Sequence, residues 1–154
     1  MTALRKTVIA LAVAALAATL VAGCSSSDTK NEYVDTVNAI QTDALQAVNE
    51  STTSQPNTTA EVIEQLESAE RILADAVTEL EGVDVPEEAE AGHPKLVAGI
   101  DDMRALFAET AEKVQSASDT EAFTELTKLV AESTTIGTEI DAAITQINQD
   151  LGAE

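Results

Sequence analysis

The chain has 154 residues and a formal net charge of −20, from 28 acidic and 8 basic side chains, and only 2% of its residues are aromatic. This length allows one domain. The excess of carboxylates argues against nucleic acid as a partner, because a surface that binds phosphates needs clustered Lys and Arg. A single cysteine excludes a disulfide scaffold.

The N-terminus has the pattern of a secretory signal peptide. Arg5 and Lys6 precede an apolar run over 8–22 in which Thr19 is the only polar side chain, and this is the order of a basic n-region and an apolar h-region. The run is short for a hydrocarbon crossing, which needs about 20 residues, and serines rather than basic residues follow it. We therefore expect cleavage rather than an uncleaved anchor.

The apolar run ends in Leu20-Val21-Ala22-Gly23-Cys24. This segment resembles the lipobox of bacterial lipoproteins, with Val21, Ala22 and Gly23 before the cysteine. The resemblance implies that Cys24 receives a diacylglyceryl thioether and becomes the mature N-terminus after residues 1–23 are removed. Two acyl chains give stable membrane anchoring, whereas a single chain binds only marginally. A signal peptide with an incidental cysteine is the alternative.

Four segments behind this signal carry apolar residues three and four positions apart, the spacing typical of amphipathic helices. They cover residues 31–50, 59–81, 94–115 and 119–151. Residues 24–30 are small and polar and are predicted to be a flexible tether. The sequence therefore predicts an all-α fold, an up-down-up-down four-helix bundle over residues 31–154 behind a signal peptide (1–23) and a short tether (24–30).

Local signals support the helix boundaries. Thr58 with Glu61, and Ser118 with Glu121, have the spacing of capping boxes. Gly82 is predicted to end the second helix, as a residue able to take positive φ. The core is expected to be aliphatic, and its only aromatic side chains are Tyr33, Phe107 and Phe123.

A second, softer resemblance covers most of the mature chain. The segment 31–41, followed by a connector with Pro86 and with His93 ahead of Leu96 and Val97, is similar to small helical lipoproteins of actinobacteria that have no assigned activity. Pro94 departs from that pattern, because it directly follows His93. The resemblance implies the fold and the location, and it supplies no catalytic residue.

Few side-chain patterns indicate chemistry. Glu90 and His93 have the Glu-x-x-His spacing of di-iron carboxylate bundles, but His93 is the only histidine of the chain, so the second copy is missing. We expect His93 to lie in a solvated, mobile connector, and we predict no metal site, no cofactor and no enzymatic activity. Acidic side chains three apart, from Glu61 to Glu70, are interpreted as a solvated face rather than as a site for cations or a basic partner.

The last helix contains one irregularity. Ser133 and Gly137 fall on positions that should face the core, and two small residues one turn apart leave a gap. Close packing or a mild bend, with a large side chain such as Met103 or Phe107 filling the gap, is one interpretation. A cavity for a small apolar ligand, lined by the same four residues, is the other.

These observations predict a lipoprotein anchored through Cys24 on the extracytoplasmic face of a bacterial cell membrane. Removal of Arg5 and Lys6 with the signal leaves 6 basic against 28 acidic side chains, so the exported chain carries a charge of −22. We expect it to act as a non-enzymatic interaction or structural module that contacts an unidentified envelope protein. The alternative function is that of a carrier with a small apolar ligand in the bundle core.

Overall fold

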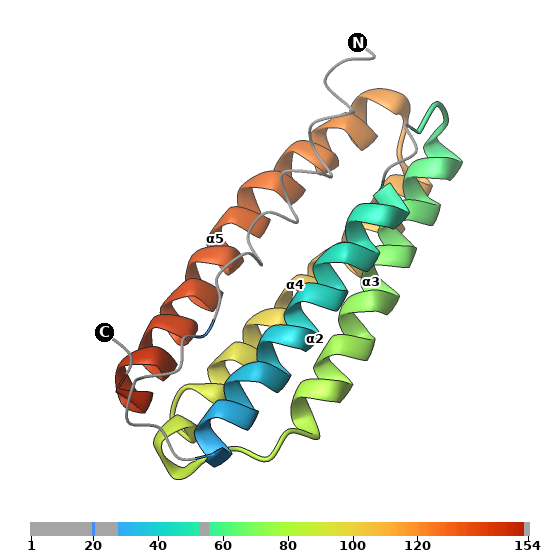
Figure 1. The fold of residues 1–154 in the computed structure, drawn as a ribbon. Helices are drawn as coiled ribbons and strands as arrows, with labels where there is room; N and C mark the ends of the chain where they lie inside the picture. Colours follow the sequence, from blue (N-terminus) through green and yellow to red (C-terminus); the bar gives the residue numbers. More distant parts are fainter. Residues whose placement is uncertain (1–19, 21–27, 53–55, 153–154) are drawn as a thin grey trace.

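The computed structural model describes residue 20 and residues 28–52 and 56–152, and Figure 1 shows them as an up-down-up-down bundle of helices. The helices are α2 (Asp28–Thr52), α3 (Thr59–Glu81), α4 (His93–Ser116) and α5 (Asp119–Leu151), and the short 3₁₀ helix η2 (Glu87–Ala89) lies between α3 and α4. The predicted fold class is confirmed. The predicted helix bounds agree with the observed ones to within three residues.

The helix ends have identifiable causes. Both predicted capping boxes are present: the Thr58 hydroxyl accepts a hydrogen bond from the Glu61 N–H at 3.2 Å, and the Ser118 N–H donates to the Glu121 carboxylate at 2.9 Å. Gly82 does end α3, but its φ is −88°, so the expected positive φ is wrong. Within the described part of the chain, only Gly152, at the end of α5, has a positive φ, of 81°.

The core lies between the four helices and is built almost entirely of aliphatic side chains. Tyr33 and Phe107 are each 1% exposed, as expected for core aromatics. Phe123 is 36% exposed, so its predicted place in the core is wrong. Ala122 and Leu126 are the buried residues of this turn, and Phe123 lies about 100° around the helix from Ala122, outside the buried stripe.

Neighbouring helices of the bundle do not all pack closely on each other. α2 packs on α3, and α5 packs on α4 and η2, whereas α2 and α5 make few direct contacts with each other. Figure 1 shows the ribbons of α2 and α5 well apart. The side of the bundle between α2 and α5 is called the α2–α5 side below.

The predicted tether is too long by three residues. Asp28, Thr29 and Lys30 belong to the first turn of α2 rather than to a flexible segment. A carboxylate in the first turn of a helix is favourable because it opposes the positive end of the helix dipole. Lys30 also makes an ion pair with Glu88 of η2 at 2.8 Å, and this hydrogen bond lowers the pKa of Glu88.

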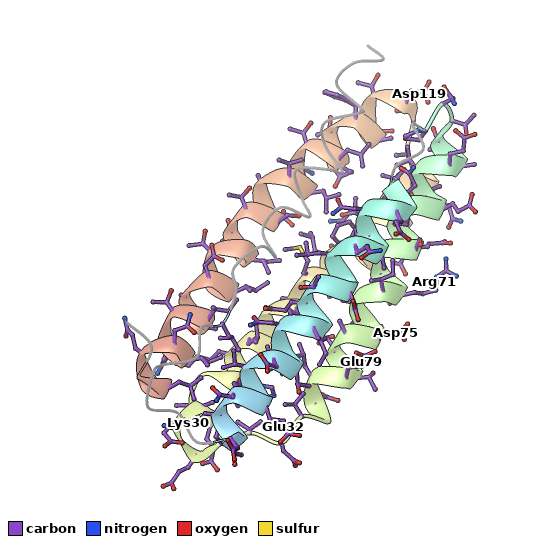
Figure 2. All side chains as sticks on the ribbon, in the orientation of Figure 1. Lys30, Glu32, Arg71, Asp75, Glu79 and Asp119 are labelled. Carbon is purple, nitrogen blue, oxygen red and sulfur yellow. The ribbon has the colours of Figure 1, made fainter. Side chains whose placement is uncertain are left out.

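Charged side chains cover the outside of the bundle. Figure 2 labels Asp75 and Glu79 of α3, and both are exposed beside a surface hollow between α2 and α3. No helix among the described residues is long and apolar enough to cross a membrane.

Candidate functional site

The lipobox residues cannot be placed. Val21, Ala22, Gly23 and Cys24 lie outside the described residues, so their predicted role stays a prediction. Leu20, the residue directly before them, is described, is 3% exposed and belongs to the hydrophobic core.

The four residues of the predicted ligand cavity all lie in the bundle interior. Met103 and Phe107 of α4 are each 1% exposed, Ser133 of α5 is fully buried, and Gly137 is buried one turn further along α5. The surface hollows between neighbouring helices are lined by other residues. The choice between close packing and a cavity therefore stays open.

His93 is not in a solvated, mobile connector, so this prediction is wrong. It is the first residue of α4 and is 6% exposed. Pro94 does not prevent the helix, because the first turn has no partner for its N–H and the fixed φ of proline suits that position. The helix therefore starts at His93 and turns the imidazole into the core.

Both ring nitrogens of His93 have buried partners. Nε2 lies 3.1 Å from the Leu80 carbonyl oxygen of α3, and Nδ1 lies 3.1 Å from the Tyr33 hydroxyl of α2. A carbonyl only accepts, so Nε2 carries the proton and donates it, while Nδ1 accepts from the tyrosine. The two rings also pack edge to face, with centroids 5.7 Å apart. His93 thus joins the start of α2, the end of α3 and the start of α4.

Burial keeps both rings of this pair neutral. It lowers the pKa of His93 by disfavouring the imidazolium, and the hydrogen bond to Leu80 opposes this shift only in part. It raises the pKa of Tyr33 to about 12 by disfavouring the phenolate. With both nitrogens engaged, His93 acts as a structural link rather than as an exposed base.

The Glu90-x-x-His93 spacing does not make a metal centre. Glu90 follows η2 and is exposed, whereas His93 points into the core toward Tyr33 and Leu80. No group of three or more His, Cys, Asp or Glu side chains that could hold a metal ion occurs among residues 28–52 and 56–152.

The second candidate site lies on the α2–α5 side, and the sequence did not predict it. The side-chain amide of Asn38 pairs with the main chain of Leu20: the Leu20 N–H donates to Asn38 Oδ1 at 2.8 Å, and Asn38 Nδ2 donates to the Leu20 carbonyl at 2.9 Å. Leu20 belongs to no helix or strand, so its main-chain groups are available for this pairing. Nothing local to Asn38 in the sequence indicates this role, because its partner lies 18 residues earlier.

Buried polar side-chain atoms without hydrogen-bond partners occur on α2 and on α5. Gln41 is one turn beyond Asn38 on the same face of α2 and is 5% exposed, and neither atom of its side-chain amide has a hydrogen-bond partner. The Ser133 hydroxyl of α5 is also buried without a partner. A buried polar group without a partner costs about 1–3 kcal/mol, so the bundle carries a local defect at Gln41.

Gln41→Leu is expected to raise the free energy of unfolding of the chain by about 1–3 kcal/mol, because it removes two buried polar atoms that bind nothing. Urea unfolding followed by circular dichroism measures the change. The matched control is Gln46→Leu, at an exposed position of α2 where the amide bonds only to Glu50, and there we expect a change within about 0.5 kcal/mol. A loss of stability in Gln41→Leu would show that this amide has a partner in solution.

Comparisons of the chain with protein-family models, with curated proteins and with solved structures give no match.

Proposed function

We propose that the mature protein is a lipid-anchored, extracytoplasmic helical module that works by binding another protein of the cell envelope. The observation that carries the proposal is the segment 20–24, which places a lone cysteine behind small residues at the end of an apolar run. The first helix that the structure describes, α2, begins at Asp28, four residues after that cysteine. Cleavage before Cys24 would remove Leu20 from the core but keep all four described helices in the mature chain.

The short distance along the chain from Cys24 to α2 limits how the anchored bundle can lie relative to the membrane. Residues 25–27 alone separate Cys24 from α2, and a chain extends at most about 3.3–3.6 Å per residue, so the tether reaches only about 14 Å. The end of the bundle that holds the start of α2, the end of α3 and η2 (Figure 1) would face the membrane. Asp84, Glu87 and Glu88 are exposed at this end.

The acidic surface fits an anchor made of lipid rather than of protein side chains. With a net charge of −22 after cleavage, the domain is repelled by anionic headgroups. Attachment would then depend on the acyl chains, while the charge keeps the bundle solvated and off the bilayer. The same charge would attract a basic partner.

A non-enzymatic role is supported by the state of His93. A general base needs a free nitrogen within reach of a substrate, and both nitrogens of the only histidine are held by Tyr33 and Leu80.

Cys24→Ala is expected to abolish lipid attachment and cleavage after Gly23. The measurement is the intact mass of the protein from bacterial membranes, together with incorporation of a labelled fatty acid. The native chain should lack residues 1–23 and carry a diacylglyceryl group, and Ser25→Ala should behave in the same way. A native chain that keeps residues 1–23, or carries no lipid, would overturn the proposal.

A further inference from the structure

The pairing of Leu20 with Asn38 has the chemistry of peptide recognition. A side-chain amide that accepts from the N–H and donates to the C=O of one residue makes the two hydrogen bonds that a residue of a neighbouring antiparallel strand would make. Such pairing recognises a residue whose main-chain N–H and C=O are both free to bond, as in peptide binding by strand addition. The side chain of Leu20 is buried at the same time, at 3% exposure.

The face of α2 that carries Asn38 is directed away from α3. Val34, Asn38, Gln41 and Leu45 follow one another at steps of four, three and four and so share one face of the helix. The hollows between α2 and α3 are lined by other α2 residues, among them Thr36, Ile40 and Ala47. Because α2 and α5 make few direct contacts, none of the helices that the structure describes packs closely on the Asn38 face.

Two further polar groups suit an occupant with a polar main chain. The Gln41 amide lies one turn from Asn38 and offers a donor and an acceptor, and both are buried without a partner. Buried polar groups are nearly always paired in native proteins, so these atoms indicate that the α2–α5 side is complete only with a further occupant.

We propose that the α2–α5 side is a binding site for an extended peptide segment, one aliphatic residue of which pairs through its main chain with the Asn38 amide. The position of this residue is called the Asn38 seat. Leu20 of the same chain fills this seat in the precursor, and an extended segment of a partner protein fills it in the mature chain. This inference rests on the proposed removal of residues 1–23, which takes Leu20 away and leaves Asn38 open. Gln41 then pairs with the main chain next to the seated residue.

The chemistry of the site favours a peptide over an acyl chain. An acyl chain would fill the place of the Leu20 side chain but would leave the amides of Asn38 and Gln41 without partners. The charge of −22 on the mature chain favours a segment flanked by basic residues. The partner is therefore expected to present a short aliphatic stretch between Lys or Arg residues.

The test uses the full chain with Cys24→Ser, so that lipid attachment plays no part, and compares it with the same chain carrying Leu20→Asp to vacate the seat. The probe is a fluorescein-labelled peptide with the sequence of residues 16–23 and two added lysines, followed by fluorescence anisotropy. We expect it to bind the Leu20→Asp chain at least about tenfold more tightly, because an occupant in the same chain competes at an effective concentration near millimolar. A peptide with aspartate in place of the leucine that corresponds to Leu20 should not bind.

Variants of Asn38 test whether its side-chain amide binds the peptide. In the Leu20→Asp chain, Asn38→Leu and Asn38→Asp should each weaken binding at least about tenfold, and circular dichroism confirms that both remain folded. Asn38→Asp keeps the size of the side chain and an acceptor but loses the donor to the carbonyl. Gln46→Leu, on an exposed position of the same helix, should leave the affinity unchanged.

Absence of peptide binding to the Leu20→Asp chain, or binding that ignores Asn38, would overturn the inference. Binding of myristate with an affinity that Asn38→Leu leaves unchanged, without peptide binding, would overturn it in favour of an acyl-chain site. These outcomes are independent of anchoring, because every protein tested carries Cys24→Ser. The intact-mass experiment on Cys24 tests the proposed function separately.

Discussion

Gly99→Val is expected to lower the free energy of unfolding by about 2–3 kcal/mol, the upper part of the range for adding methyl groups to a packed core. A Cβ atom at position 99 of α4 would lie 2.7 Å from Ile140 Cγ1 of α5, well inside the 3.5–4.0 Å of ordinary carbon contacts. A Cβ at Gly92 would collide with the Cγ1 of Ile147 in the same way. The two glycines therefore allow α4 and α5 to approach each other closely.

Thermal unfolding measures this effect, and for a chain of this size the loss corresponds to a melting temperature lower by about 4–12 °C. Gly82→Val is the matched control, because Gly82 has a right-handed φ and a Cβ there meets nothing closer than 3.4 Å. We expect that control to stay within about 0.5 kcal/mol of the native chain.

A double-mutant cycle assigns the cause of the loss. Ile140→Ala removes the Cγ1 atom that a side chain at position 99 would meet, so the loss in Gly99→Val with Ile140→Ala should be smaller than the sum of the two single losses by about 1 kcal/mol or more. Additive losses would mean that the Gly99 contact does not limit the approach of α4 and α5.

The helices were predictable because each is specified by local sequence. The seam of Val62, Leu66, Ala69, Leu73 and Leu80 and the cap at Thr58 placed α3 correctly. A heptad stripe and a cap act within one or two turns, so they can be recognised without knowing the neighbouring helices.

The candidate sites depend on contacts between distant residues, and local patterns miss these. Gly92 and Pro94 suggested a loop, although proline in the first turn is compatible with a helix start. The burial of His93 follows from Tyr33, which lies 60 residues earlier, and from Leu80. Asn38 and Gln41 look like exposed polar positions in the sequence, but Asn38 pairs with the main chain of Leu20 and Gln41 is buried.

His93→Phe is expected to lower the free energy of unfolding by about 1–3 kcal/mol, although it keeps an aromatic ring in the core. The change leaves the buried Tyr33 hydroxyl without its partner, and such a group costs about 1–3 kcal/mol. The Leu80 carbonyl still accepts a hydrogen bond from the Val83 N–H at 3.2 Å. Tyr33→Phe should cost about 1–3 kcal/mol, because it leaves only His93 Nδ1 unpaired. The double variant should lose less than the sum, since the unpaired hydroxyl is then absent.

The same pair limits stability at both ends of the pH range. The folded pKa of His93 lies below its ordinary value of 6.5, so the unfolded chain takes up a proton first and stability falls as the pH drops below about 6.5 toward the folded pKa. The folded pKa of Tyr33 is about 12 against 10.0 in the unfolded chain. The unfolded chain loses this proton first, so stability falls as the pH rises from about 10 to 12.

The composition allows each titration to be observed separately, because the chain has one histidine and one tyrosine. The single imidazole signal in proton NMR should titrate below 6.5, and tyrosinate absorbance should appear only near pH 12. The carboxylates titrate mostly below about pH 5, so the loss of stability between pH 5 and 6.5 should disappear in His93→Phe. An imidazole that titrates at or above 6.5 would contradict the buried link, because only a solvated or charge-paired histidine keeps its proton at that pH.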